Sequence, residues 1–385
     1  MRSLIIEMKE PDVFVVADNV LSAIGRTTAE NFSKLKENIS AVKQHADPAI
    51  SPKSFFAALF KKGEQFIKDG NGKYTKFEQL LIASIEDALQ DSGVEARDKK
   101  TVLIISSTKG NISLLDDQPY QPGLKDKIAL SSSAELVANY FGFQNQPVIV
   151  SNACISGVMA IVTGMRLLRS MAYENAVIAG ADVISAFIMS GFESFKALSP
   201  QLCRPFDQSH DGLNLGEGAG TMILSTDKKY AQNIKVKGGS VSNDANHISG
   251  PSRTGQELAL AIANALGDAG VSQADIGFIS AHGTATVYND EMEANAIAIA
   301  GLQHVPLNSL KSYYGHTLGA AGLIESVISV QSLKEGYYLP TMGFNDAGLA
   351  GKMNVLSAPA QFSTNNILKT ASGFGGCNAA VVFGK

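Results

Sequence analysis

Residues 148–169 constrain the fold of this chain more than any other stretch. They begin with the β-branched run VIV, which is typical of a buried strand. A few small residues follow, and a continuous apolar segment then predicts a helix that is buried on most sides. Cys154 lies in the corner between the two, next to Ala153, Ser156 and Gly157, which are small enough for a sharp turn. The pattern is that of a nucleophile elbow with sulfur in place of oxygen.

The position of Cys154 also predicts a reactive thiolate. The start of a helix offers unpaired N–H groups and the positive end of the helix dipole, and both favour the thiolate over the thiol. A lone buried cysteine is nevertheless more often an inert small apolar residue. This stretch alone therefore leaves both interpretations open, and the rest of the chain has to decide between them.

Composition excludes several classes of function. The net charge is −4, which argues against a nucleic-acid-binding surface as a global property. The three cysteines, Cys154, Cys203 and Cys377, lie far apart, so neither a disulfide framework nor a paired-cysteine zinc site is expected. No stretch reaches the ~18 uninterrupted apolar residues of a membrane span, and the N-terminus does not have the pattern of a signal peptide. We therefore expect a cytoplasmic protein without a membrane segment.

Strand-like and helix-like segments alternate along the chain, and the order starts again near residue 230. We predict strands at 13–18, 101–107, 148–150, 175–182 and 220–226, then at 234–243, 276–283, 365–373 and 379–384, with helices at 28–39, 77–90, 155–169, 255–269 and 319–333. The repeated order predicts two α/β halves, 1–229 and 230–385, with mixed, mainly parallel sheets covered by helices.

Two histidines follow strand-like runs, as Cys154 does. His282 lies in SAHGTAT and His316 in KSYYGHTLGAAG, and the small residues around them leave an imidazole accessible at a strand end. Reactive groups gather beyond the carboxyl ends of strands in open α/β sheets. Either histidine alone could be structural, but their joint placement with Cys154 favours catalysis. The three residues lack metal-ligand spacing, and no GxxxxGK[ST] phosphate loop is present.

Five motifs together resemble those of the β-ketoacyl-acyl carrier protein synthases, the condensing enzymes of fatty acid and polyketide synthesis, of the elongating Cys-His-His type. They are NACISG at 152–157, the segment 203–220, AHGTAT at 281–286 with Asp290, KSYYGHTLGAAGLIE at 311–325 and SGFGGCN at 372–378. The resemblance covers nearly the whole chain and is weakest before Phe77 and across 109–133. It implies the thiolase fold, a five-layered αβαβα arrangement of two duplicated halves, usually dimeric.

The resemblance implies a ping-pong reaction. Cys154 would accept an acyl group from the phosphopantetheine of acyl carrier protein, and the backbone N–H groups of Cys154 and Phe374 would form the oxyanion hole. His282 and His316 would stabilise the enolate that a malonyl group leaves when it loses CO2. No metal or organic cofactor is implied, because decarboxylation drives the condensation.

The resemblance assigns supporting roles as well. Lys311 would pair with Glu325 and set the electrostatics of the site. Thr284 and Thr286 would bind the pantetheine amides. Phe374 would also act as a gate between the acyl pocket and the malonyl channel.

The sequence departs from the family pattern in two of these motifs. HGTGTPxGD is replaced by HGTATVYND, which places Ala285 where the family has glycine. NSFGFGG becomes TASGFGG, so Ser372 replaces an aromatic residue near the acyl pocket. We hypothesise an acyl chain of different bulk or stiffness, such as a polyene or an aryl-primed chain. Cys377, where the family often has threonine, is expected to be a packing residue.

The expected partner is acyl carrier protein, with a homodimer as the first expectation and a heterodimer as the alternative. Because carrier proteins are acidic, a cluster of basic residues is a candidate docking patch, with a solvated helix face as the other interpretation. The cluster comprises Lys61, Lys62, Lys68, Lys73 and Lys76.

Three rival functions remain. A thiolase acting on CoA esters shares the fold but needs a second reactive cysteine in its own C-terminal motif. A Cys/His hydrolase explains neither the second histidine nor Lys311. A chain-length-setting partner subunit without activity usually lacks the nucleophile that Cys154 provides here.

Overall fold

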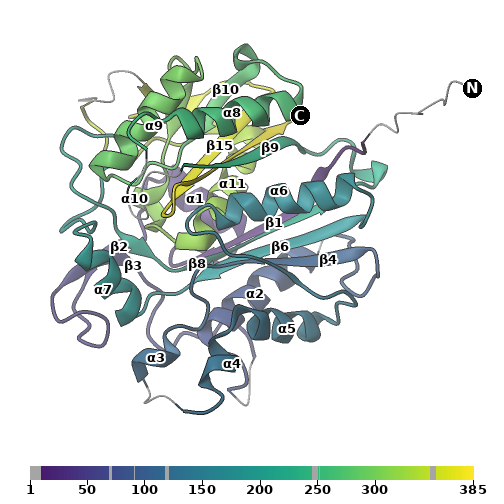
Figure 1. Ribbon diagram of the computed structural model, residues 1–385, viewed down its shortest axis with the longest axis vertical. Helices are drawn as coiled ribbons and strands as arrows, with labels where there is room; N and C mark the ends of the chain where they lie inside the picture. The colour runs from purple at the N-terminus through teal and green to yellow at the C-terminus, as the bar shows by residue number, and fades with distance from the viewer. Residues whose placement is uncertain are drawn as a thin grey trace, which may run out of the picture.

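The computed structural model describes residues 10–68, 72–90, 92–117, 121–244, 250, 252–346 and 353–385. Two twisted sheets dominate it (Figure 1). The first has the strand order β1 (Phe14–Ser22), β8 (Gly218–Ser225), β6 (Asn175–Asp182), β4 (Thr101–Ser106), β5 (Val148–Val150). The second has the order β9 (Lys235–Asn243), β16 (Cys377–Gly384), β15 (Asn366–Gly373), β10 (Ile276–Ser280), β11 (Pro306–Asn308), β13 (Asn354–Val355).

When each sheet is read outward from the edge they share, the strands of the first sheet match the first five of the second, and among the described residues β13 has no counterpart. That edge is formed by β1 and β9, which pair at Phe14 and Lys235. In the first sheet β1 is followed by β8 and then by β6. In the second sheet β9 is followed in the same way by β16 and then by β15. The predicted duplication of the fold is therefore confirmed.

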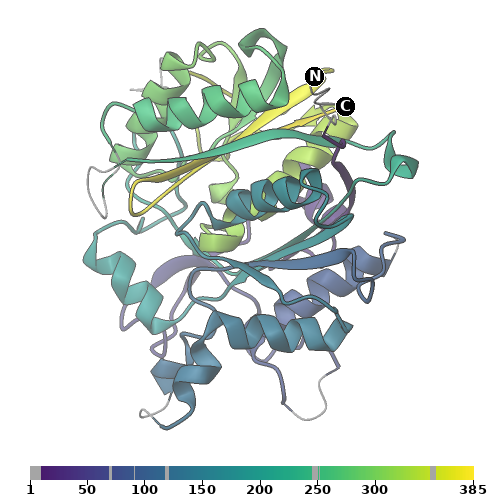
Figure 2. The ribbon, with the colours of Figure 1, turned by 45° about the vertical axis from the view of Figure 1, so that its right-hand side comes forward.

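Layers of helices alternate with these two sheets, so the fold has five layers. Two central helices, α6 (Ser156–Arg169) and α11 (Leu318–Glu335), lie between the sheets (Figures 1 and 2). The outer layers are α2 (Lys76–Gln90) with α5 (Leu130–Phe141) on the first sheet, and α8 (Gln256–Ala269) with α9 (Val287–Ile299) on the second. Because sheets cover α11 on both sides, almost its whole surface is buried, and apart from Glu325 its sequence is apolar or small all round until the last turns.

The two central helices cross through reciprocal glycines. A Cβ on Gly157 of α6 would collide with the backbone nitrogen of Leu323, and one on Gly322 of α11 would lie 2.9 Å from the backbone nitrogen of Val158. Only glycine allows two backbones to approach so closely. Because both glycines lie near the start of their helices, the crossing brings together the two turns that lead into them.

The pairing directions correct one expectation. The sheets are mixed, as predicted, but parallel pairing does not dominate. It is confined to the outer strands, whereas the series β15, β16, β9, β1, β8, β6 is antiparallel throughout. Strands β15 and β16 are joined by a three-residue turn, and a connection that short can join only antiparallel strands.

Several smaller elements complete the described chain. They are α1 (Thr28–Lys36), β2 (Val42–His45), β3 (Phe55–Ala58), α3 (Leu114–Asp117), α4 (Leu124–Ile128), α7 (Ala186–Ser194), β7 (Leu215–Gly216), η1 (Lys228–Tyr230), η2 (Gln273–Asp275), α10 (Lys311–Tyr314), β12 (Tyr337–Tyr338) and β14 (Ala360–Gln361). Among the described residues, no helix has the length and apolar character needed to cross a membrane.

Candidate active site

Cys154 lies in a strained corner between β5 and α6. Ala153, just before it, has a φ of +43°, a left-handed conformation that costs a non-glycine residue energy. The corner is held by Ser156, whose Oγ accepts the N–H of Asn152 at 2.8 Å and donates to the carbonyl of Ala153 at 2.6 Å. The helix begins two residues after the cysteine, at Ser156. The expected elbow is therefore present, with its sulfur ahead of the helix.

His316 reaches this sulfur from the other half of the molecule. Its Nε2 lies 3.0 Å from Cys154 Sγ. The histidine follows α10 and precedes α11, and its backbone N–H donates to the carbonyl of Asn214 at 2.6 Å. The ring of His282, from the turn after β10, meets the His316 ring edge to face with centroids 5.5 Å apart. All three residues are almost fully buried: Cys154 is 8% exposed, His316 1% and His282 2%.

The three residues line one cavity of about 460 Å³. Its other walls include most of the residues expected to bind substrate: Thr284, Thr286, Ser372 and Phe374. Lys311 and Glu325 are not part of this lining; they lie behind the histidines. Both halves of the chain thus contribute to a single pocket, which is large enough for a thioester and its carrier arm.

Burial controls the protonation of the site. It raises the pKa of the Cys154 thiol to about 12, with Cys377 raising it further and Lys311 lowering it. It also lowers the pKa of His282 and of His316 well below the usual range, and Lys311 adds to both effects. The resting site therefore holds a thiol and two neutral imidazoles. The prediction of a resting thiolate is wrong, because desolvation outweighs the helix dipole at a sulfur that precedes the helix.

Lys311 and Glu325 form a buried ion pair behind the histidines. The Lys311 ammonium also donates to the carbonyl of His282 at 3.0 Å. The lysine thus touches the backbone that carries one imidazole, while its charge acts on both. The geometry is the one that the sequence motifs imply.

Two further buried charges were not predicted. Lys369 of β15 lies 2.7 Å from the second oxygen of Glu325. Glu293 of α9 accepts the backbone N–H groups of His282 and Gly283, each at 2.7 Å. The signal for Lys369 was available, because it is the only charged residue in the otherwise apolar or small run 366–373.

The threonines lie in the turn after His282. The hydroxyls of Thr284 and Thr286 are 2.8 Å apart, and the backbone N–H of Thr284 donates to Asp290 at 3.0 Å. Burial raises the pKa of the Asp290 carboxyl to about 6. This turn presents two hydroxyls to the cavity and is tied to the start of α9.

Phe374 lies in the turn between β15 and β16, opposite the nucleophile. A Cβ on the preceding Gly373 would lie 2.8 Å from the backbone nitrogen of Cys154, so this turn packs directly against the elbow. The Phe374 ring is 38% exposed, stacks on Phe192 with centroids 5.8 Å apart and meets Phe195 edge on at 5.3 Å. Its position at the rim of the cavity suits a gate.

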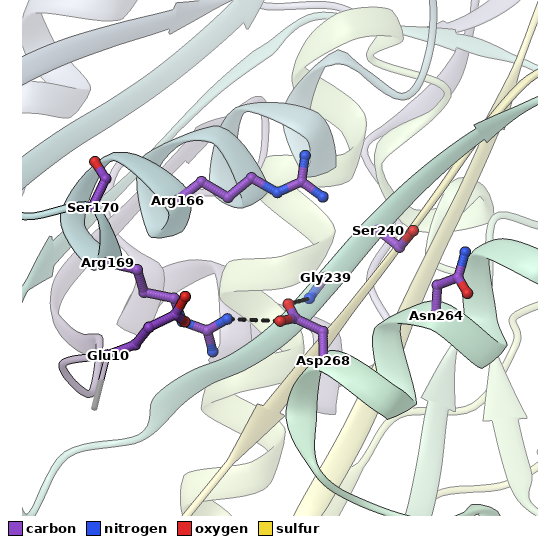
Figure 3. A pocket seen from close by; sticks show the side chains of 8 residues that line it. All are labelled: Glu10, Arg166, Arg169, Ser170, Gly239, Ser240, Asn264 and Asp268. Atoms are coloured by element: carbon purple, nitrogen blue, oxygen red, sulfur yellow. Dashed lines mark hydrogen bonds and ion pairs between the residues drawn. The ribbon is translucent and has the colours of Figure 1, made fainter. Parts of the chain in front are cut away.

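A second cavity, of about 390 Å³, lies at the other end of α6 between that helix and α8 (Figure 3). Its lining is charged but largely paired: Arg169 contacts Asp268 at 2.9 Å and Glu10 at 3.5 Å. It has no cysteine or histidine in its lining. Among the described residues, no three His, Cys, Asp or Glu side chains are grouped so that they could hold a metal ion. We therefore take the first cavity as the candidate active site.

Comparison with known proteins agrees with this geometry. The family description "Beta-ketoacyl synthase, N-terminal domain" matches residues 12–230, and "Beta-ketoacyl synthase, C-terminal domain" matches residues 234–345. The chain belongs to the β-ketoacyl synthase family. The resemblance seen in the sequence motifs is thereby confirmed, and the chain is a condensing enzyme of the acyltransferase class.

Individual relatives extend over the whole chain. The 3-oxoacyl-[acyl-carrier-protein] synthase 2 of Vibrio cholerae is 31% identical and covers 98% of this chain and 99% of its own length. Among solved structures, the ishigamide ketosynthase/chain length factor has a TM-score of 0.87 at 25% identity and covers 98% of this chain and 100% of its own. The ketosynthase ApeO in complex with its chain length factor ApeC, from Xenorhabdus doucetiae, has a TM-score of 0.85 at 26% identity, with coverage of 97% and 98%. The expected thiolase fold is confirmed.

Proposed function

We propose that this β-ketoacyl synthase is a 3-oxoacyl-acyl carrier protein synthase, which joins an acyl group to malonyl-acyl carrier protein with loss of CO2. One observation carries the proposal: Cys154 Sγ lies 3.0 Å from His316 Nε2, with His282 beside them in the same cavity. A nucleophile and two neutral N–H donors are what transthioesterification followed by enolate formation requires. The name of the Vibrio cholerae relative supports the choice of substrate.

In the first half-reaction, Cys154 attacks the thioester carbonyl of acyl-carrier protein. The thiol proton passes to the neighbouring Nε2 of His316 and then to the departing phosphopantetheine sulfur, so a C–S bond forms as another breaks. The backbone N–H groups of Cys154 and Phe374 bind the oxygen of the tetrahedral intermediate. The close packing of the Gly373 backbone against Cys154 supports this pairing.

In the second half-reaction, malonyl-carrier protein enters the same cavity. His282 and His316 donate hydrogen bonds to its thioester oxygen, His316 now as the neutral tautomer that carries its proton on Nε2, and the C–C bond to the carboxylate breaks to give CO2 and an enolate. Neutral donors suit this step because negative charge appears where none existed before. The enolate carbon attacks the acyl-Cys154 carbonyl and expels the thiolate, which takes up a proton. Thr284 and Thr286 hold the pantetheine arm, and the Lys311–Glu325 pair fixes the histidines.

Intact mass spectrometry tests the proposal. Incubation with acyl-carrier protein should add one acyl mass at Cys154, and malonyl-carrier protein should then convert this adduct into a carrier-bound 3-oxoacyl product. Release of free acid without consumption of malonyl groups would instead indicate a hydrolase. Reaction with CoA esters but not carrier-bound acyl groups would indicate a thiolase, and absence of any adduct would indicate a chain-length-setting subunit.

The free edge of the first sheet supports a dimer. Strand β5 is outermost and, among the described residues, pairs only with β4, and Ile149 on it is 37% exposed. Such an edge is open to pairing with another chain. We propose a homodimer across β5, with a chain-length-factor heterodimer as the alternative because solved relatives are titled as such complexes. A monomer in sedimentation experiments, at all concentrations, would contradict both.

The docking patch for the carrier protein is smaller than the sequence suggested. Lys76 is paired with the buried Glu217 at 2.6 Å and therefore belongs to the structure of the protein. Lys61 and Lys62 are exposed, and only a distant contact of 4.0 Å joins Lys62 to Asp47. Changing Lys61 and Lys62 to Glu should raise KM about tenfold for carrier-bound substrate but not for a small pantetheine mimic. An equal rise for both substrates would exclude docking as the cause.

Ser372 bears on the acyl chain that the cavity accepts. Ser372 lines the cavity, and its hydroxyl donates to Asn378 at 2.8 Å, which leaves room where the family pattern has an aromatic ring. This supports the hypothesis of a bulky or stiff acyl chain, such as a polyene. Best turnover of straight saturated chains, in a panel of acyl-carrier proteins, would contradict it.

Three further predictions from the sequence stand as proposals. They are the division into halves at 1–229 and 230–385, a cytoplasmic location, and a reaction that needs no cofactor beyond the carrier-bound phosphopantetheine.

A further inference from the structure

Lys369 occupies an unusual position for a lysine. It is fully buried in β15, and its ammonium group lies 2.7 Å from Glu325 Oε2 and donates to the carbonyls of Ala281 at 3.1 Å and Ser280 at 3.3 Å. Burying a charge is costly unless it is paired and hydrogen-bonded, and here it is both. None of the steps described above uses this residue.

Lys369 and Lys311 together hold the strand end that carries His282. Lys369 binds the carbonyls of Ser280 and Ala281, and Lys311 binds the next carbonyl, that of His282 itself. Glu325 lies between the two ammonium groups and gives one carboxylate oxygen to each. Three successive carbonyls at the end of β10 are therefore fixed from one side by two cations.

The other charged groups around the imidazoles occupy different sides. Glu293 accepts the backbone N–H of His282, together with the hydroxyl of Thr370 at 2.7 Å, and Asp290 holds the turn that follows. Tyr314 is neutral, because burial raises the pKa of its hydroxyl well above the usual range. Cys154 is a thiol at rest. The two lysines are thus the positive charges that face His282 and His316.

We propose that Lys369 is a positioning residue for condensation: it fixes the end of β10 beneath His282 and adds a second positive charge to the Lys311–Glu325 pair behind both imidazoles. This inference rests on the function proposed above and deepens it. Lys311 and Glu325 alone form a pair whose charges cancel. Burial lowers the pKa of Lys369, and the neighbouring Glu325 carboxylate opposes that shift. In its protonated form Lys369 leaves the cluster with a net positive charge, which opposes protonation of the two rings.

The causes of the lowered histidine pKa values agree with this geometry. After burial, positive charge at Lys311 and Lys369 contributes to the lowered pKa of both His282 and His316. An imidazole that stays neutral remains an acceptor for the thiol proton and an uncharged donor to the enolate oxygen. The second lysine should therefore extend activity to lower pH.

Lys369→Met tests the inference, because methionine has a similar length and no charge. The matched control is Lys100→Met, which removes a half-exposed lysine paired with Glu174 at 3.5 Å on the surface. Because the pKa of each ring lies well below the usual range, two readouts are compared from pH 8 down to the lowest pH at which the protein stays folded. They are the rate of malonyl decarboxylation, and the ring signals of His282 and His316 in NMR spectra recorded without substrate.

We expect Lys369→Met to move both histidine titrations and the acid limb of the rate profile to higher pH. On that limb the rate should fall about tenfold for each pH unit of displacement, with kcat affected more than KM and the rate near wild type at pH 8. Lys100→Met should change neither readout. Should Lys369→Met fail to fold, Lys369→Gln answers the same question, because it keeps an N–H donor for the Ala281 carbonyl and loses only the charge.

Two results would overturn the inference: histidine titrations that coincide with those of the wild type, or a rate that falls by the same factor at every pH. The NMR titration needs no turnover. If the wild-type protein never condensed carrier-bound substrates, the proposed function would be wrong. The NMR titrations would still show whether Lys369 lowers the pKa of the two histidines.

Discussion

The two halves of the molecule share a fold but carry different side chains in equivalent turns. In the first half, the turn from β5 into the central helix α6 carries Cys154. In the second half, the corresponding connection from β11 into the central helix α11 carries Lys311 and His316. Because duplicated halves present equivalent strand–helix turns, the same structural position carries a cysteine on one side and a lysine and a histidine on the other.

A second pair of equivalent turns shows the same divergence. After β10, the second half places His282 and the threonines, whereas after β4 the first half places Ser107 and Thr108, which bind the buried carboxylate of Asp182. Asp182 also accepts the N–H of Gly319 at 2.7 Å, in the first turn of α11. This turn of the first half thus supports the helix of the second half and carries no catalytic group.

The largest expected effect separates the two halves by function. Cys154→Ala should lower condensation by more than about 10³-fold because it removes the nucleophile, yet it should leave decarboxylation of malonyl-carrier protein. His316→Ala should abolish both reactions, because it removes a donor to the enolate oxygen. Condensation and CO2 release are followed in parallel for each variant. If His316→Ala kept full decarboxylation, the assignment of enolate stabilisation to the second half would be wrong.

The next effect tests how tightly the halves are joined. Gly157→Ala or Gly322→Ala inserts a methyl group between two helix backbones, and we expect each to lower the free energy of unfolding by about 3 kcal/mol. Activity should fall as well, because the crossing sets the distance between the turns that carry Cys154 and His316. Gly267→Ala is the control, since a Cβ there meets no atom within 4 Å. It should be neutral or slightly stabilising in urea denaturation, and equal losses at all three glycines would contradict the close crossing.

Most of the fold and the residues of the candidate site could be predicted from the sequence, but the protonation states of those residues could not. The segment 175–182 reads as a strand from its apolar run alone, and β6 has these bounds. The helix α7 and the two-residue strand β7 were not predicted, because neither shows a clear periodic pattern. The high pKa of Cys154 follows from burial by both halves, which no local pattern contains.

Charges that meet across the sequence were missed for the same reason. Lys369 and Glu293 belong to segments that contact only in the folded chain, through Thr370 and the backbone of His282. The sequence motifs contain the residues that react with substrate. The sequence marks Lys369 as the one charged residue of the run 366–373, but the groups that Lys369 and Glu293 contact are defined only by the folded chain.

The next prediction concerns how stability depends on pH, and it compares one buried carboxyl group from each half. Burial raises the pKa of Asp182 and of Asp290 to about 6, from an unfolded value near 4. Between these values the folded state binds more protons than the unfolded state, so each group lowers stability as pH rises from about 4 to 6. The loss for each is about 3 kcal/mol at most.

Asp182→Asn isolates the contribution of the first half. Since asparagine does not titrate, the stability of the wild type relative to the variant should fall by up to about 3 kcal/mol between pH 4 and pH 7. Urea denaturation at a series of pH values measures this difference, and the other titrating groups cancel because both proteins contain them. A difference that stays constant with pH would show that Asp182 titrates normally.

The smallest effect concerns strain in the two catalytic turns. Ala153 before the nucleophile and Ala285 after His282 both have positive φ, at +43° and +61°. Ala285→Gly relieves a left-handed alanine, which costs about 1 kcal/mol, but it adds a similar amount of chain entropy to the unfolded state. Because these terms oppose each other, we expect stability to change by less than about 1 kcal/mol and activity to stay within twofold. A loss above about 2 kcal/mol in urea denaturation would mean that the buried Ala285 methyl stabilises the turn by packing. Backbone strain would then not be a property that the turns at Ala153 and Ala285 have in common.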